Sequence, residues 1–340
     1  MVFRRRGGLL FHSLISPDAL NTTDERQKSV QSGVVAVIVT HRRLAELQRL
    51  LDSLAASTVP LLGCVVSDHA PTGEVRALAA RSALETLVLE DCSNPGPGAG
   101  WANATAKALD HFQGKVFVIW YLDDDVVIPP GALKTLLEEM ERVDAGAIAP
   151  LLEDEAGRLW AFPEPVPVPL RKTIRSAVTP ADALRLLGEN PVPFCWCTGA
   201  CFLVKKTTID AVGLHRTDFW MLGEDLEYSM RIASRGKAVF TSRVSVPHLP
   251  PPARDAAGAR RADYGKFCSL LQNLSYLSFH APHSRHMKSY LPGNYRRFFR
   301  THGLHPRSVR DALACLWNGA VLARPGESLR DRISKNERRN

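Results

Sequence analysis

A continuous apolar run near the N-terminus constrains the fold of this 340-residue chain more than any other stretch. Residues 34–39 read VVAVIV. Such a run, rich in β-branched residues and without polar alternation, is typical of a strand buried on both faces of a sheet. Leucines follow at positions 44, 47, 50, 51 and 54, the spacing of one helix face. A doubly buried strand before an amphipathic helix predicts a sheet covered by helices on both sides.

The alternation of strand and helix patterns continues along the chain. Further strands are expected at residues 61–66, 86–89, 116–122, 147–150, 202–204, 236–240 and 245–248. Helices are expected at 75–84, 101–112, 133–143, 181–187 and 226–234, and the rest of 163–193 is expected to be a loop. The predicted fold class is α/β, with a mostly parallel central sheet, helices on both faces and a helical, basic C-terminal region.

These patterns divide the chain into three predicted parts. Residues 1–32 are polar and basic and are predicted to form a flexible segment. Residues 33–260 hold the strand and helix alternation and form the predicted α/β domain. Residues 261–340 are predicted to be helical with basic faces.

Composition and charge narrow the class of protein. A hydrophobic content of 45% excludes a disordered chain, and no apolar run is long enough to span a bilayer. The net charge is +8, and C-terminal arginines lie among Phe298, Phe299 and Trp317. This mixture favours contact with an anionic membrane surface; nucleic acid and an ordinary solvated face are the alternatives. The seven cysteines lack zinc-site spacing, so reduced, mostly buried thiols are expected.

Three consecutive aspartates, Asp123–Asp125, follow the strand expected at 116–122. Clustered carboxylates repel one another, and a bound Mg²⁺ or Mn²⁺ offsets that repulsion through hard oxygen ligands. A solvated acidic turn is the alternative. In a parallel sheet, ligands bind beyond the carboxyl ends of the strands. That rule places Thr40, Asp68 and the three aspartates around one crevice.

Two later segments carry side chains that suit catalysis or metal binding. Glu224 and Asp225 begin a predicted helix, where a carboxylate either caps the helix or stays ionised as a general base. His248 follows a predicted strand and is either a packed histidine or a metal ligand through its imidazole. The glycine-rich segment 94–100 precedes a helix, where it is either a plain turn or a close approach of backbone to a ligand.

These features in this order resemble the inverting family 2 glycosyltransferases of GT-A fold. The resemblance covers about residues 33–275. It is carried by the segments VIVTHRR (37–43), VVSD (65–68), LDDD (122–125), CTGACF (197–202) and GEDLE (223–227), by Asn94, Gly98, Gly100 and Asn103, and by His248. The family's members transfer a sugar from a nucleotide-diphosphate donor with the help of Mg²⁺ or Mn²⁺.

The resemblance implies a role for each matching residue. Asp225, with Glu224 beside it, corresponds to the base that activates the acceptor hydroxyl. Asp123, Asp125 and His248 correspond to the metal ligands. The implied donor-binding residues are Thr40, Arg42, Arg43, Asp68, Asn94, Gly98, Asn103, Asp123, Asp124 and Trp196. The resemblance makes 33–260 the nucleotide-sugar-binding and catalytic domain, and 261–340 the region that contacts acceptor or membrane.

Within the family, the segments THRR (40–43) and LWAFP (159–163) are most similar to bacterial galactofuranosyl- and rhamnosyltransferases. UDP-galactofuranose or dTDP-rhamnose is the implied donor, and a lipid-linked or cell-envelope glycan the implied acceptor. The expected location is cytoplasmic, peripheral on the inner face of a bacterial membrane, with no nucleic acid partner. Two departures are Gln272-Asn273 in place of Arg-Asn and Ser67-Asp68-His69 in place of Asp-Asn.

Two other functions stay open from the residues alone. A nucleotidyltransferase also places carboxylates at strand ends to hold Mg²⁺, but it normally has a glycine-rich phosphate loop after the first strand, where this chain has THRR. The second is a protein that keeps a transferase scaffold but only binds carbohydrate or a membrane surface. The intact set of acidic residues argues against this second function, because a non-catalytic protein would not need them.

Overall fold

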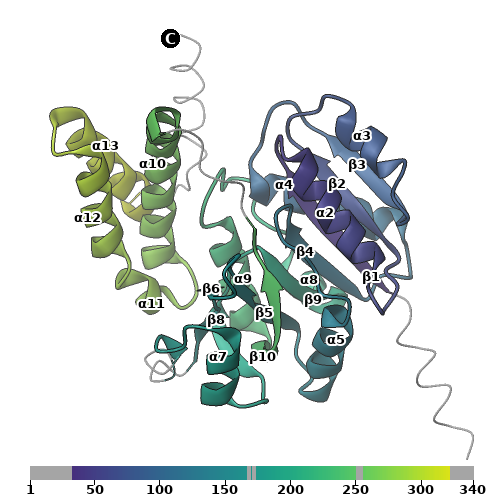
Figure 1. Cartoon of the computed structure of the whole chain (residues 1–340). Helices are drawn as coiled ribbons and strands as arrows, with labels where there is room; N and C mark the ends of the chain where they lie inside the picture. The colour runs from purple at the N-terminus through teal and green to yellow at the C-terminus, as the bar shows by residue number, and fades with distance from the viewer. Residues whose placement is uncertain (1–32, 167–169, 171–173, 250–255, 322–340) are drawn as a thin grey trace, which may run out of the picture.

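A single mixed sheet organises the chain in the computed structural model, which describes residues 33–166, 170, 174–249 and 256–321 (Figure 1). Its strand order is β3-β2-β1-β4-β9-β5-β10-β8-β7, and β6 pairs with β5. The predicted flexible segment 1–32 and the arginines beyond 321 lie outside the described residues. The first four strands are β1 (Val34–Thr40), β2 (Gly63–Asp68), β3 (Thr86–Glu90) and β4 (Val118–Asp123).

These four strands are parallel, so their carboxyl ends lie on one edge of the sheet. In the second half, β9 runs antiparallel between β4 and β5, and β10 returns parallel to β5. The strands of this half are β5 (Ala147–Glu153), β6 (Leu159–Ala161), β7 (Glu164–Pro165), β8 (Val192–Trp196), β9 (Cys201–Lys205) and β10 (Ala238–Pro247). The mostly parallel sheet is confirmed, and the antiparallel β9 joins its two halves.

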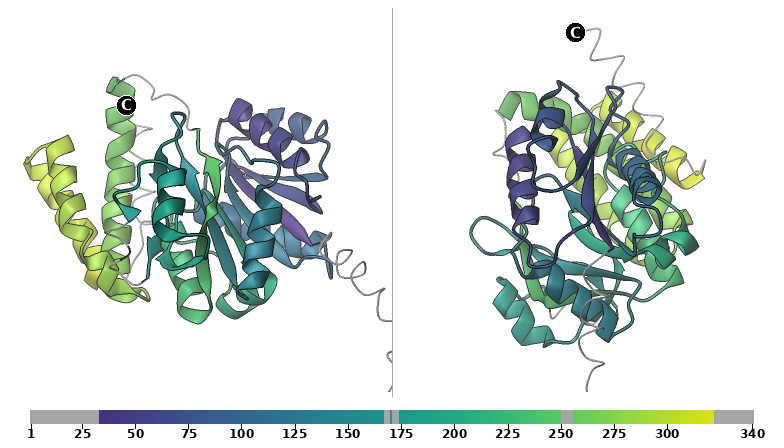
Figure 2. Two further views of the ribbon diagram at one scale, coloured as in Figure 1. Left: turned by 60° about the horizontal axis from the view of Figure 1, so that its bottom comes forward. Right: turned by 90° about the vertical axis from the view of Figure 1, so that its right-hand side faces the viewer.

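Helices cover both faces of the sheet, as Figure 2 shows from two sides. Alternate residues of β1 point to opposite faces: Ala36 and Ile38 pack into one core, and Val35 and Val37 into the other. The first core is closed by α2 (Leu44–Ala55), α3 (Glu74–Ala79) and α5 (Ala132–Arg142). The second is closed by α4 (Pro97–His111), α7 (Pro180–Leu187), α8 (Lys206–Val212) and α9 (Glu224–Arg235). Burial on both faces explains the unbroken apolar run.

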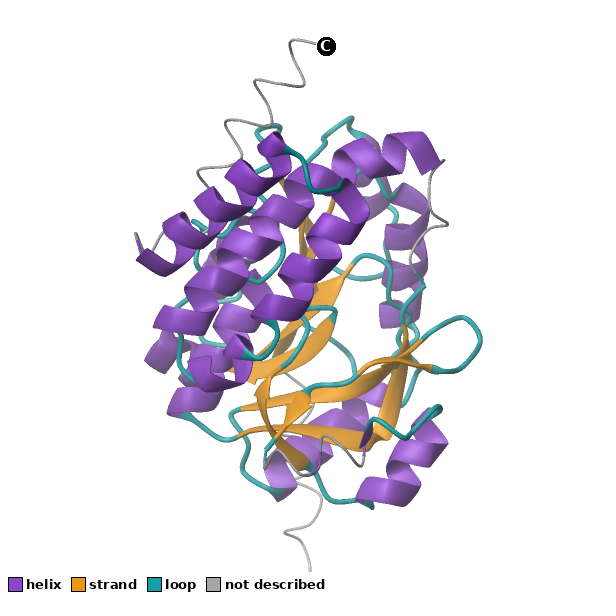
Figure 3. Cartoon of the chain, turned by 90° about the vertical axis from the view of Figure 1, so that its left-hand side faces the viewer, coloured by secondary structure: helices purple, strands orange, loops and turns teal. Residues whose placement is uncertain are grey.

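The C-terminal helices form a separate layer beside the sheet, in front in Figure 3. They are α10 (Ala256–His280), α11 (Ser284–Lys288), α12 (Leu291–His302), α13 (Pro306–Leu316) and the π-helical turn η2 (Trp317–Val321). Phe298 is fully buried and packs with Phe267, Leu271 and Cys315 in a core of this layer. A second apolar cluster, which includes Phe219 and Leu277, joins the layer to the α/β part. Helix α10 runs through the boundary predicted at residue 260.

Several predicted boundaries are wrong. The strands expected at 236–240 and 245–248 are one strand, β10, whose register shifts between Phe240 and Ser245. Residues expected to be loop form β7 and the start of β8. The helix expected at 101–112 begins at Pro97, because proline and small residues are well tolerated in a first helical turn. The helix expected at 75–84 ends at Ala79.

Two predictions about composition can be compared with the described residues. None of the seven cysteines forms a disulfide, and all but Cys92 are buried, as expected. Among the described residues, no helix combines the length and the apolar character needed to cross a bilayer.

Candidate active site

The site is built on the carboxyl ends of three neighbouring strands. Thr40 at the end of β1 lies beside Asp68 at the end of β2, and Val39 lies beside Asp123 at the end of β4. The parallel register therefore brings together side chains that are 28 to 83 residues apart in the chain, as predicted from strand ends alone. Asp68 is buried, accepts a hydrogen bond from the Ala70 amide, and has a raised pKa because of its burial.

Asp124 is held by the segment that follows β1. The Thr40 hydroxyl donates to Asp124 Oδ2 at 2.7 Å, and the Arg43 guanidinium donates to Asp124 Oδ1 at 3.0 Å. Burial raises the pKa of Asp124 to about 6, against the stabilising contacts with Arg43 and Thr40. Two of the predicted donor-side residues, Thr40 and Arg43, thus contact the acidic cluster directly.

Asp125 lies between two basic side chains. Arg43 donates to Asp125 Oδ2 at 2.5 Å, and His248 Nε2 lies 3.2 Å from Asp125 Oδ1. Burial acts to raise the pKa of Asp125, but His248 and Arg43 outweigh it and the net pKa is lowered. Asp125 is therefore the one carboxylate of Asp123–Asp125 whose ionised form the fold stabilises.

Backbone pairing places His248 in this position. The His248 amide donates to Glu153 O at 2.8 Å, and the Leu249 amide donates to Asp125 O at 2.8 Å. His248 also forms a β-bridge with Val126. The end of β10 is thus joined to both β5 and the residues after β4, and it cannot move independently of Asp125.

Asp123, Asp125 and His248 form a group that could hold a metal ion. One ligand atom from each residue lies within 4.8 Å of the others. Two carboxylates and an imidazole are a donor set that suits Mn²⁺ or Mg²⁺. The three predicted metal ligands are therefore adjacent in space.

The loop before β9 links Asp225 to the cluster. The Gly199 amide donates to Asp225 Oδ2 at 2.9 Å, while the Asp123 amide donates to the carbonyl of the next residue, Ala200, at 3.0 Å. Asp225 Oδ1 accepts from the Leu226 amide at 2.8 Å. A Cβ on Gly199 would meet the Trp101 ring at 2.3 Å, so only glycine fits there without movement.

Burial and mutual repulsion raise the pKa values of the other carboxyl groups. The pKa of Asp123 is well above its usual range because of burial, and then because of Asp125, Asp124 and Asp225. Burial raises the pKa of Asp225 against the amides of Gly199 and Leu226. Burial and Asp225 together hold the pKa of Glu224 well above its usual value, and Glu224 Oε2 has no hydrogen-bond partner in the described part of the chain. The fold keeps these groups close at an electrostatic cost.

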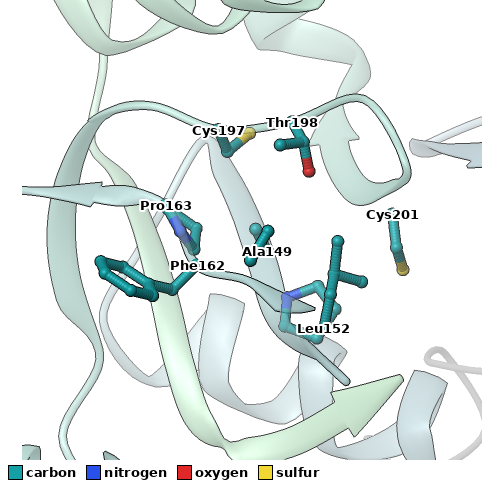
Figure 4. Close-up of a pocket in the computed structure, with 9 residues that line it drawn as sticks. Ala149, Leu152, Phe162, Pro163, Cys197, Thr198 and Cys201 are labelled. Atoms are coloured by element: carbon teal, nitrogen blue, oxygen red, sulfur yellow. The ribbon is translucent and has the colours of Figure 1, made fainter. Parts of the chain in front are cut away.

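A small pocket adjoins the loop 197–201 (Figure 4). Its walls come from β5, from the connection between β6 and β7, and from the loop itself. Thr198 points into the space above Ala149 and Leu152, with Phe162 and Pro163 on one side. Because the next residues, Gly199 and Ala200, hold Asp225 and Asp123, the pocket lies beside both aspartates.

In the described part of the chain, the side-chain hydrogen bonds of the cluster involve none of the remaining predicted donor-side residues, Arg42, Asn94, Gly98, Asn103 and Trp196. A Cβ on Gly98 would meet the Arg216 carbonyl at 2.7 Å and the Glu224 Cβ at 3.2 Å, so this glycine lets the backbone before Glu224 approach α4 closely. Arg42 and Asn94 have positive φ angles of 58° and 47° in turns. Asn103 is exposed on α4. Trp196 ends β8 with its ring edge-on to Tyr290, 5.9 Å between centroids.

Sequence reasoning gave no role to Asn273, which holds the turn before Glu224. Its side-chain amide donates to Met221 O at 3.1 Å and to Leu222 O at 2.7 Å, and Ser269 donates to the same Met221 carbonyl. Leu222 and Gly223 have φ angles of 63° and 109°, a conformation that costs energy at Leu222. Only the departure Gln272-Asn273 marked this position, because a contact across some 50 residues has no local pattern.

Comparison with known sequences identifies relatives. Residues 35–206 match the Glycosyl transferase family 2 family. The N-acetylglucosaminyl-diphospho-decaprenol L-rhamnosyltransferase of Mycobacterium tuberculosis (strain ATCC 25618 / H37Rv) is 25% identical over 230 residues, which cover 62% of this chain and 74% of the relative. Galactofuranosyltransferase GlfT1 of the same strain is 31% identical over 227 residues, 65% of this chain and 71% of the relative.

Solved structures share the fold at low sequence identity. TarS 1–349 from S. aureus in complex with UDP-GlcNAc has a TM-score of 0.54 at 15% identity, covering 89% of this chain and 83% of that chain. Mannosyltransferase PcManGT from Pyrobaculum calidifontis, in complex with GDP-Man and Mn²⁺, has a TM-score of 0.50 at 18% identity, covering 89% and 85%. The predicted GT-A fold is confirmed by these neighbours.

Asn273→Ala tests the support of the turn before Glu224. It removes the side-chain donor to the Leu222 carbonyl and leaves the Met221 carbonyl with Ser269 alone, so we expect a loss of about 1–3 kcal/mol in the free energy of unfolding by urea. The matched control is Asn294→Ala, because Asn294 makes one bond within its own helix, to Tyr290 O. Equal effects of the two substitutions would contradict the role given to Asn273.

Asp123→Asn tests the electrostatic cost of the cluster, measured in chelator by urea unfolding at pH 5 and pH 8. The pKa of Asp123 is raised in the folded state, so the protonated carboxyl favours folding. This stabilisation is fully present below the unfolded-state pKa of about 3.9 and is lost as the pH rises through the raised folded-state pKa. The amide cannot ionise. We therefore expect the variant to gain stability relative to the native chain as pH rises, and a constant difference would refute the repulsion.

Proposed function

The chain belongs to glycosyl transferase family 2 and is a glycosyltransferase of GT-A fold, and from this premise we propose an inverting sugar transfer with Asp225 as general base. The donor is a nucleoside-diphosphate sugar, UDP-galactofuranose or dTDP-rhamnose. The acceptor is a hydroxyl of a lipid-linked or cell-envelope glycan. The names of the two relatives, a galactofuranosyltransferase and a rhamnosyltransferase of a decaprenyl-linked sugar, support this choice.

One observation carries the proposal. The loop 199–200 bonds Asp225 through one residue and Asp123 through the next. In-line displacement at a sugar carbon needs a base close to the metal-binding carboxylates, because the acceptor attacks opposite the leaving diphosphate. Neither alternative function gains support from the relatives.

Asp123, Asp125 and His248 fit a divalent cation, as their adjacent donor atoms indicate. When bound, Mn²⁺ or Mg²⁺ neutralises the charge that develops on the leaving diphosphate. Arg43 is close enough to Asp124 and Asp125 to add a second positive charge on this side of the crevice. Thr40 and Asp68 offer polar groups for the nucleoside, and Arg42, Asn94, Gly98, Asn103 and Trp196 remain proposed donor-side residues.

Asp225 meets the requirements of a general base. Two backbone amides fix its carboxylate, one on each oxygen. Its pKa is raised by burial, so it is a stronger proton acceptor than an exposed aspartate. Removal of the acceptor proton by Asp225 accompanies attack of the acceptor oxygen on the anomeric carbon, and the nucleoside diphosphate leaves from the other face.

Asp225→Asn tests the base. The amide keeps the size and accepts the Gly199 bond but cannot take a proton, so we expect kcat to fall about 10²–10⁴-fold while binding of UDP with Mn²⁺ persists. The measurement is mass spectrometry of products from a panel of nucleotide sugars with a decaprenyl-linked acceptor, alongside UDP calorimetry. The control is Asp210→Asn, an exposed aspartate paired with Lys206. Native turnover by Asp225→Asn would remove Asp225 from the mechanism.

The C-terminal layer offers a surface for the membrane that carries a lipid-linked acceptor. Val309, Leu313, Trp317 and Val321 are spaced four residues apart and are 37%, 62%, 57% and 55% exposed. Residues 281–321 contain seven Lys or Arg and one acidic residue, Asp311. An exposed apolar stripe on a basic layer fits the interface of an anionic bilayer. The proposed location is therefore peripheral, on the cytoplasmic face of the membrane.

Leu313→Asp with Trp317→Asp tests this surface by flotation with phosphatidylglycerol vesicles. We expect at least about tenfold weaker binding, because burial of a large apolar side chain contributes about 1.5–3 kcal/mol. Val178→Asp, at a similarly exposed position on the α/β part, is the control. Binding unchanged by the double substitution, or unaffected by high salt in the native chain, would contradict the membrane contact.

A further inference from the structure

An exposed tryptophan stacks on the imidazole of His248. The Trp160 and His248 rings lie 3.9 Å apart between centroids, with 28° between their planes. His248 is 6% exposed and Trp160 is 46% exposed, so the indole covers the imidazole from the solvent side. Trp160 lies in β6, whose pairing with β5 brings it beside the end of β10.

Stacking matters here because His248 lacks the usual second support. A metal-binding histidine normally donates its other ring N–H to a carboxylate or a carbonyl, which fixes the ring orientation. Nε2 of His248 faces Asp125, but in the described part of the chain Nδ1 is buried and has no hydrogen-bond partner. Backbone pairing fixes the main chain of His248 but leaves the side-chain torsions to other contacts.

We propose that Trp160 positions the His248 imidazole for a divalent cation, by ring stacking in place of the second hydrogen bond. The inference rests on the cation site of the proposed function. The imidazole is confined between the indole face and Asp125, so its Nε2 stays directed at the carboxylates. Trp160 is a positioning residue, and its effect on a cation is exerted through His248.

Direct titration of the full-length protein with Mn²⁺ alone, followed by the electron paramagnetic resonance signal of free Mn²⁺, tests this role. Loss of a supporting contact to a metal-binding histidine typically weakens metal binding 10–100-fold, so we expect at least about tenfold weaker binding by Trp160→Ala. Trp160→Phe keeps a ring for stacking and should bind close to native. Phe117→Ala removes an exposed ring just before β4, at the end of that strand opposite Asp123, and should have no effect.

A double-variant comparison separates positioning from direct contact. If Trp160 acts through His248, then Trp160→Ala should change nothing further once His248→Ala is present. An equal loss of Mn²⁺ affinity from Trp160→Ala in the native chain and in the His248→Ala variant would overturn the proposal. Native Mn²⁺ binding by Trp160→Ala, or binding by Trp160→Phe as weak as that of Trp160→Ala, would overturn it as well. If the native chain itself binds no Mn²⁺, the cation site fails with the inference, whereas loss of the Trp160 effect alone leaves that site standing.

Discussion

The repulsion among the carboxyl groups of Asp123, Asp124, Glu224 and Asp225 is the constraint on which the rest of the structure depends. Burial raises the pKa of each of them, and neighbouring carboxylates raise the pKa of Asp123, Asp124 and Glu224 further. A chain under selection for stability alone would not gather these groups in one buried place. Fixed donors surround the cluster: Arg43, Thr40, His248 and the amides of residues 199 and 226. A cation bound here would favour the ionised forms of carboxyl groups that burial now disfavours.

Strands from both halves of the sheet position the residues of this site. Parallel strands supply Thr40, Asp68 and the three aspartates from one edge. The antiparallel β9 lets the loop before it contact Asp123 and Asp225 at once, because the loop enters β9 where β4 ends. The long strand β10 carries His248 to the same edge. The mixed second half of the sheet thus completes a site that the parallel first half begins.

The C-terminal layer belongs to the same arrangement through α10. Asn273 and Ser269 bond to the turn that precedes Glu224, and α13 and η2 of the same layer carry the exposed stripe from Val309 to Val321. One layer therefore contacts both the turn before the proposed base and the proposed membrane surface. The family match ends at residue 206, before Asp225 and His248, so the link between these residues and the aspartates is made by the fold.

The sequence by itself determined the alternation of strands and helices, the rim of Thr40, Asp68 and Asp123–Asp125, and the family. These follow from short-range patterns. A continuous apolar run suits a strand buried on both faces, and polar residues that follow such strands lie at the carboxyl edge of a parallel sheet. Only the tertiary structure decided that β10 is one strand, that Gly98 faces Arg216, that Asn273 holds the turn at Leu222, and that Trp160 covers His248. Each of these contacts joins residues far apart in the chain, and their geometry depends on packing that no local pattern records.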